Sequence, residues 1–335
     1  MAMSLGPPVD GEPVTITRER ARRDVIWDAL CRRYPRGRNV DATTIRELRI
    51  TRSIMGIFYD KDVTRCAEAP SGIAVGLMWS DQYDEPPPKG NKFRYRYPET
   101  DRKGIRNEKE IQAVKAAAQW KLPVFIIDAV TDKVKRQIVP AWVLSWDDRQ
   151  LCFLLSLAAP SVEDLESPNL DATPFELTTS RSRKRVSSFG RDGQDEFAFH
   201  CFKRYGEQCA ICPIALRPLL DAAHIYAYGH GGSNDPRNSL PLCKLHHAAY
   251  DAEIITINPD TLGVEITLPG LTLADLNVTY ASIEHLERKP HEQALRWAYE
   301  RASATVNRRK AKTEHQRRYR LKKAAEKKAF TEKDG

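Results

Sequence analysis

The sequence predicts an α+β protein of two folded domains followed by a basic helical extension. Its 335 residues are enough for two domains of ordinary size. Short apolar runs typical of strands fill residues 54–157, with one clear helix among them. Two pairs of metal-ligand side chains lie between residues 209 and 246, and residues 307–330 are strongly basic. These observations divide the chain into a first domain at 1–156, a linker at 157–189, a second domain at 190–280 and a helical extension at 281–335.

The first domain is expected to combine helices with a curled sheet or small barrel. Residues 18–35 have their apolar side chains at helical spacing, and residues 107–120 form a second predicted helix. Six runs are expected to be strands because apolar residues, many of them β-branched or aromatic, dominate them: IMGIFYD, GIAVGLMW, KFRYRYP, PVFIIDAV, QIVPAWVLSW and LCFLLSL. Prolines and many Ser, Thr and acidic residues at 157–189 end this pattern, which predicts the linker.

Two short ligand pairs predict a structural zinc site in the second domain. The first pair is Cys209 with Cys212, and the second is Cys243 with His246. Two such pairs can close a tetrahedral site of thiolates and imidazole around one Zn²⁺, with no position left for substrate. The other cysteines of the seven follow no pairing pattern, which indicates a reducing, intracellular setting, so we expect a cytoplasmic protein.

The same region resembles the HNH (ββα-metal) endonuclease family. The matching stretches are RDGQDEFAFHCFKRYGEQCAIC, LDAAHI, NSLPLC and HHAAYD, which lie between residues 191 and 257. A His, an Asn and a second His occur in the order and at the spacing of the family: His224, Asn238 and His247. The resemblance implies a zinc-stapled fold of two strands and a helix, and an activity that cleaves DNA phosphodiester bonds.

The resemblance also implies a role for each residue of the motif. His224 would be the general base that activates the attacking water, a task that suits a neutral imidazole at physiological pH. Asn238 would brace the loop that orients this base, and an approach to the metal is a second role that stays open for it. His247 and Asp251 are four residues apart, so on a helix they share one face. In the family this face holds a divalent cation, which here would be Mg²⁺, or else Mn²⁺ or Ni²⁺.

Three points stay open within this motif. Many family members have Asp or His directly before the general base, whereas this chain has Ala223, and Asp221 two residues earlier is interpreted as structural. His246 and His247 could exchange roles, although the spacing of the zinc pair favours His246 as the zinc ligand. His230 is interpreted as a loop residue rather than a ligand because it lies in the run GHGG.

Aromatic and arginine residues gather around two strand-like runs of the first domain. Aromatic rings can cage a flipped base, and arginines beside them can hold phosphates. The candidates for this contact are Trp79, Tyr83, Phe93, Tyr95, Tyr97, Arg94 and Arg96. The same rings could instead fill a barrel core. The order of strand, YRY, helix and strand, joined to an HNH region, resembles the SRA, EVE and PUA-like readers of modification-dependent (type IV) restriction enzymes.

The net charge of +8 comes from the end of the chain. Residues 307–330 hold eleven Lys and Arg against two Glu, whereas the first 306 residues sum to about zero. A helix with cations around most of its surface predicts non-specific contact with duplex DNA, although a solvated extension would have the same composition. No apolar run approaches the roughly 20 residues of a membrane helix and the N-terminus lacks a signal-peptide pattern, so we expect no membrane partner.

These features predict a modification-dependent restriction endonuclease. The N-terminal domain would recognise a modified base in double-stranded DNA, with 5-methylcytosine as one candidate, and the HNH region would hydrolyse the backbone nearby. Cutting both strands needs two active sites, which favours a homodimer. Two alternatives are an HNH endonuclease or nickase that reads unmodified sequence, and a non-catalytic, zinc-stabilised DNA-binding protein.

Overall fold

The structure is a computed structural model that describes residues 5, 11–52, 56–79, 91–98, 105–128, 136–160, 170–179 and 193–331. The chain divides into two compact units. The first comprises Met1–Thr173 and Lys184–Phe199, and the second comprises Pro174–Arg183 and His200–Gly335. The division falls within α6 (Gln194–Tyr205).

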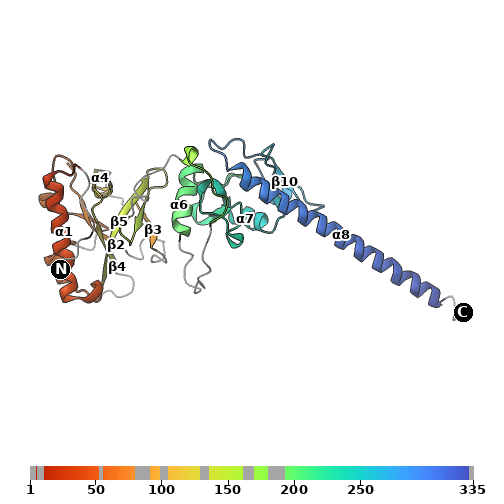
Figure 1. Ribbon diagram of the computed structural model, residues 1–335, viewed down its shortest axis with the longest axis horizontal. Helices are drawn as coiled ribbons and strands as arrows, with labels where there is room; N and C mark the ends of the chain where they lie inside the picture. The colour runs from red at the N-terminus through yellow and green to blue at the C-terminus, as the bar shows by residue number, and fades with distance from the viewer. Residues whose placement is uncertain are drawn as a thin grey trace. The chain divides into compact units, whose positions relative to one another are not determined.

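A six-stranded sheet forms the centre of the first unit (Figure 1). The strand order is β1-β2-β4-β5-β6-β3, in which β2 and β4 are parallel and the other neighbouring pairs are antiparallel. The strands are β1 (Ile57–Tyr59), β2 (Ala74–Trp79), β3 (Lys92–Arg96), β4 (Val124–Asp128), β5 (Gln137–Asp147) and β6 (Cys152–Ser156).

Helices cover both faces of this sheet. Side chains alternate along β4, so Val124 and Ile126 join one core cluster while Phe125 and Ile127 join the other. The first cluster includes the buried side of α4 (Ile105–Gln119), and the second includes residues of α1 (Val14–Arg33) and α2 (Ala42–Glu47). The shorter elements are η1 (Pro35–Gly37), α3 (Lys61–Thr64) and η2 (Leu170–Ala172).

The expected α+β class is confirmed, but the expected barrel is not seen. Each of the six apolar runs contains one strand, and the two predicted helices correspond to α1 and α4. In the described part of the chain, β1 and β3 are the two edges of the sheet and do not pair with each other. Closure into a barrel would require that pairing, because a barrel has no free edge.

The second unit contains a hairpin followed by a helix. β7 (Leu220–His224) pairs antiparallel with β8 (Ser239–Cys243), and the register sets His224 opposite Ser239. α7 (Lys244–Asp251) begins directly after β8. The remaining elements are β9 (Ile255–Ile257) and β10 (Val264–Ile266), with the short turns η3 (Arg217–Leu219), η4 (Tyr228–His230), η5 (Pro236–Asn238) and η6 (Ala274–Leu276).

A helix of 40 residues, α8 (Glu292–Thr331), ends the described chain (Figure 1). At 1.5 Å per residue it is about 60 Å long. Near its start, Ala294, Leu295, Ala298 and Ala302 are buried, whereas every described side chain from Lys310 to Lys323 is exposed. Packing therefore holds the first part of this helix, and the described side chains from Lys310 to Lys323 do not take part in it. Neither α8 nor any other helix among the described residues has an apolar stretch that could cross a membrane.

Candidate active site

Three cysteines and one histidine form a compact, buried cluster in the second unit. The Sγ atoms of Cys212 and Cys243 lie 3.9 Å apart, and Nδ1 of His246 lies 3.2 Å from Cys243 Sγ. With Cys209, the four ligand atoms lie within 4.8 Å of one another. A tetrahedron with Zn–S bonds of about 2.3 Å has edges of about 3.8 Å, so the cluster has the size of a zinc site.

The local structure prepares these four side chains as ligands. Nε2 of His246 lies 2.9 Å from the carbonyl oxygen of Leu276, which accepts a hydrogen bond from the Nε2–H and leaves Nδ1 as the coordinating nitrogen. Burial lowers the pKa of His246, so the imidazole is neutral, as a metal ligand must be. Burial also raises the pKa of Cys209 to about 12 and raises that of Cys212. Thiolates at these buried positions need a cation to compensate their charge, which fits a bound metal ion.

His224, the predicted general base, is the last residue of β7 and is half-buried. Its Nε2 lies 3.1 Å from Oδ1 of Asn234, and its ring meets that of Tyr228 edge-on with centroids 5.5 Å apart. An amide oxygen only accepts hydrogen bonds, so Nε2 carries the proton in this pair. In the neutral ring, Nδ1 would then be the nitrogen without a proton, and a general base requires such a nitrogen.

Asn238 lies at the end of η5 and its side chain is fully buried at 0% exposure. Its Oδ1 accepts a hydrogen bond from the backbone N–H of Tyr226 at 2.8 Å. Its Nδ2 donates to the carbonyl oxygens of Tyr226 at 3.2 Å and Ser233 at 3.0 Å. The amide therefore ties down the segment that directly follows His224.

A close backbone approach tightens the same loop. A Cβ atom at Gly232 would lie 2.0 Å from the carbonyl oxygen of Tyr226, so no other residue fits at this position without a shift of the backbone. The loop after His224 is thus held from two sides, by the amide of Asn238 and by the contact at Gly232.

His247 lies between two carboxylates. Its Nδ1 is 3.0 Å from Oδ2 of Asp221 on β7, and its Nε2 is 3.5 Å from Oδ2 of Asp251 one helical turn later. Nζ of Lys244 also contacts Asp221, at 2.5 Å. Burial raises the pKa of Asp221, but the hydrogen bonds from His247 and Lys244 outweigh it and hold that pKa below its ordinary value. Asp221 is therefore ionised and pairs with Nδ1 of His247, which leaves Nε2 as the ring nitrogen that faces the Asp251 carboxylate.

The two neighbouring histidines of α7 serve different clusters. Successive helical residues point about 100° apart. His246 is 1% exposed and faces the cysteines, whereas His247 is half-buried and contacts Asp221. In the structure, His246 is the histidine that lies with the three cysteines.

Sequence reasoning treated Asp221 as structural and did not single out Asn234 or Tyr226. A signal existed for Asp221, because it lies two residues before Ala223 and alternation places both on one strand face. No comparable signal marked Asn234 or Tyr226, because their contacts depend on how the loop between β7 and β8 folds back. His230 lies in η4, as expected for a loop residue, and its Nδ1 is 3.4 Å from Nη1 of Arg301.

The rings proposed as a base cage are buried in the core of the first unit. The described members and their exposed fractions are Trp79 at 5%, Phe93 at 1%, Tyr95 at 3% and Tyr97 at 5%. They share one cluster with residues of α4. The hydroxyl of Tyr95 donates to the carbonyl oxygens of Gly56 and Met78, and that of Tyr97 donates to Asp148. Rings covered this closely cannot stack on a base unless their neighbours move.

The remaining candidates for base or phosphate contact differ from these rings. Arg94 and Arg96 alternate with the aromatic residues along β3 and are half-buried, so their side chains point to the other face of the strand. Tyr83 lies outside the described residues.

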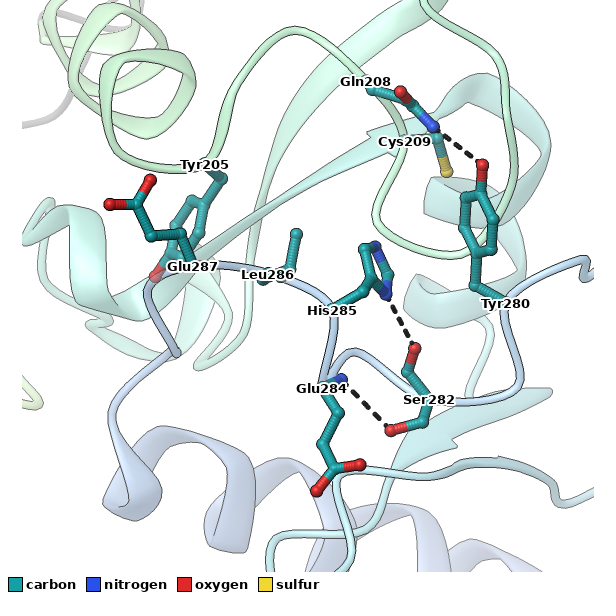
Figure 2. A pocket seen from close by; sticks show the side chains of 9 residues that line it. All are labelled: Tyr205, Gln208, Cys209, Tyr280, Ser282, Glu284, His285, Leu286 and Glu287. Carbon is teal, nitrogen blue, oxygen red and sulfur yellow. Dashed lines mark hydrogen bonds between the residues drawn. The ribbon is translucent and has the colours of Figure 1, made fainter.

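A pocket of about 540 Å³ opens beside the cysteine cluster, between residues 205–209 and 280–287 (Figure 2). Figure 2 shows Nε2 of Gln208 donating to the hydroxyl of Tyr280 at 3.0 Å, with Cys209 next to Gln208. Glu284 and Glu287 are the charged side chains of its lining, which includes no Lys or Arg. An acidic lining disfavours binding of phosphate in this pocket.

Comparison with known families identifies the region around this site. Residues 209–258 match the HNH_2 family, described as HNH endonuclease. This match supports a nuclease. All residues of the cysteine cluster, His224, Asn238, His247 and Asp251 lie inside the matched segment, whereas α6 and α8 lie outside it.

Two solved structures are similar to the chain at low TM-scores. The "Modification dependent TagI restriction endonuclease" has a TM-score of 0.35 and 16% identity, over 80% of this chain and 92% of that one. The "Type IV phosphorothioation-dependent restriction endonuclease ScoMcrA" has a TM-score of 0.24 and 13% identity, over 86% of this chain and 64% of that one. A comparison with curated proteins finds no match.

Proposed function

We propose that the second unit is a metal-dependent DNA endonuclease in which His224 acts as the general base. One observation carries this proposal: the buried amide of Asn238 holds the backbone around Tyr226 with hydrogen bonds, so the segment after His224 is fixed. A base that is already oriented toward its substrate avoids the entropic cost of finding that geometry. The match of residues 209–258 to HNH endonucleases supports the same chemistry.

In the proposed reaction, Nδ1 of His224 takes a proton from water as the water oxygen attacks the phosphorus atom. The bond from phosphorus to the leaving 3′-oxygen breaks, and this oxygen takes up a proton from solvent. Asn234 Oδ1 accepts the Nε2–H of His224 and so keeps the ring in the tautomer that reacts. The same oxygen stabilises the imidazolium that forms when Nδ1 becomes protonated.

His247, through Nε2, and Asp251 are the residues that would hold a catalytic cation, and Asp221 at Nδ1 would fix the orientation of the His247 ring. Their oxygen and nitrogen atoms suit Mg²⁺, Mn²⁺ or Ni²⁺. A cation bound there supplies charge stabilisation to the phosphate and to the leaving oxygen. The cysteine cluster would hold Zn²⁺ as a structural ion, because four protein ligands complete a tetrahedron.

The first unit is proposed to select the target, with a modified base such as 5-methylcytosine in double-stranded DNA as the proposed mark. Arg94 and Arg96 on the edge strand β3 provide positive charge for phosphate contacts. The buried rings would have to leave the core to cage a base. Their burial favours a second candidate, an HNH endonuclease or nickase whose first unit reads unmodified sequence. Cleavage of both strands would require two copies of the chain, so a homodimer is part of the first proposal.

Plasmid digestion tests these proposals. We expect cleavage of 5-methylcytosine-containing plasmid with Mg²⁺, Mn²⁺ or Ni²⁺, and little cleavage of the unmodified plasmid. His224→Ala should slow cleavage by about 100-fold or more. His285→Ala is the matched control, because it removes an exposed histidine of the same unit outside the motif. Equal cutting of both plasmids would support the second candidate, and no cutting by the wild-type protein with any of the three cations would support a non-catalytic DNA-binding protein.

A further inference from the structure

The first part of α8 packs on the loop that carries the proposed general base. The indole ring of Trp297 stacks on the ring of Tyr226, with centroids 4.0 Å apart and an interplanar angle of 26°. Tyr226 is the residue whose backbone N–H and carbonyl oxygen are held by Asn238. The same residue is therefore fixed by its backbone from η5 and by its side chain from α8.

Trp297 is itself held in place by its neighbours. The guanidinium of Arg301, one helical turn later, lies over the indole at 5.3 Å from the ring centroid, and the ring of His230 is 5.7 Å away. Buried Leu295 and Ala298 anchor the helix beside it. The indole is thus a fixed surface against which Tyr226 rests.

A second set of contacts ties α8 to the end of α7. Glu253, two residues after Asp251, accepts hydrogen bonds from Arg301 Nε and from the hydroxyl of Thr305. Arg309 donates to the carbonyl oxygen of Ala252 at 3.1 Å. These contacts fix the position of α8, so the indole of Trp297 does not depend on the exposed end of the helix for its place.

We propose that Trp297 is a positioning residue for cleavage. It holds Tyr226, and through it the segment that follows His224, in the orientation that the base needs. The inference rests on the proposed function, and it concerns a helix that lies outside the segment matched to HNH endonucleases. Trp297 touches neither the motif histidines nor DNA in this role, so its loss should lower kcat and leave the KM for DNA unchanged.

The test compares Trp297→Ala, Trp297→Phe and the control Tyr299→Ala. Tyr299 is an aromatic residue of the same helix whose hydroxyl contacts Glu265 instead of the loop after His224. We expect Trp297→Ala to lower kcat about tenfold with unchanged KM, because misplacement of a reacting group is costly. Trp297→Phe should restore most of kcat, because a smaller ring can still stack on Tyr226, and Tyr299→Ala should match the wild type.

Hydrogen exchange at the Tyr226 amide gives a readout that does not need activity. This N–H donates to Asn238, so loosening of the loop should speed its exchange in Trp297→Ala and not in Tyr299→Ala. Wild-type kcat in Trp297→Ala, or unchanged exchange at Tyr226, would overturn the inference. So would equal losses in Trp297→Ala and Tyr299→Ala. By contrast, full activity of His224→Ala would overturn the proposed function, and the exchange measurement would still decide the role of Trp297.

Discussion

Replacing Asn238 by alanine removes three hydrogen bonds from a site that is closed to solvent. The amide is 0% exposed and bonds the N–H and carbonyl oxygen of Tyr226 and the carbonyl oxygen of Ser233. A buried polar group that loses its partner costs about 1 kcal/mol or more. We therefore expect Asn238→Ala to lower the free energy of unfolding of the second unit by about 3 to 4 kcal/mol, a large part of the roughly 5 to 15 kcal/mol of an ordinary domain.

Chemical denaturation and plasmid cleavage are the two assays for this variant. Asn258→Ala is the matched control, because Asn258 also makes three side-chain hydrogen bonds, to Glu265, Asp260 and Thr261, but at the exposed surface. The control should lose less than about 1 kcal/mol and cleave at the wild-type rate, whereas Asn238→Ala should cleave much more slowly even where it is folded. If Asn238→Ala were as stable and as active as Asn258→Ala, the amide would not be what fixes the loop after His224.

The variant Asn238→Asp tests the same hydrogen bonds through their dependence on pH. Its carboxylate can still accept from the Tyr226 N–H, but its second oxygen faces two carbonyl oxygens in place of an N–H donor. Burial and these oxygens raise the pKa of such an aspartate above its unfolded value. Relative to the wild type, its free energy of unfolding should therefore be greatest at low pH, where the acid is protonated and can donate, and should fall as the pH rises. A variant whose stability relative to the wild type rose with pH over that range would contradict this account.

Three further predictions concern the cysteine cluster, the contacts of Glu253 with α8, and the basic end of α8. Cys212→Ser should abolish zinc binding in metal analysis and lower the melting temperature of the second unit, whereas Cys201→Ala, a buried cysteine outside the cluster, should keep the zinc. Burial raises the pKa of Glu253, but hydrogen bonds from Thr305 and Arg301 outweigh it and hold the pKa below 4.5. The free energy of unfolding of Glu253→Gln should thus lie below that of the wild type by a constant amount above pH 4.5, and this difference should shrink as the pH falls through the folded pKa. A difference that stays constant at low pH would show that the ionised Glu253 does not stabilise the position of α8. Deletion of residues 310–335 removes ten Lys and Arg. If about half of them contact phosphate, the slope of log affinity for DNA against log salt concentration should become shallower by about 4. An unchanged slope would mean that this end of the helix does not bind DNA.

Sequence patterns were sufficient wherever structure follows from short-range spacing. One turn holds Cys209 and Cys212, and the start of one helix holds Cys243 and His246. The two pairs therefore meet once the hairpin between them closes. The apolar runs of the first unit became strands because β-branched and aromatic side chains fit a sheet that is covered on both faces.

Long-range contacts were not predictable in the same way. Alternation places Phe93 and Tyr95 on one face of β3 and continues to Tyr97 just after it, but this pattern is the same for a ring that lines a pocket and for one that packs on α4. The contact of Asp221 with His247 depends on how α7 lies against β7, and the stack of Trp297 on Tyr226 joins residues that are 71 positions apart in the sequence. Packing between elements, which local spacing does not encode, decided these cases.

The exposed end of α8 has a length that matters for the choice of substrate. Residues 310–331 rise about 33 Å along the helix axis, close to the 34–36 Å of one turn of B-DNA. A cationic rod of this length, laid along a duplex, covers about ten base pairs beyond the point where the first part of the helix is anchored. Fragments shorter than that reach only a part of the charge. A C-terminal helix that binds DNA in this way would make the length of the duplex a criterion of selection, in addition to any mark on its bases.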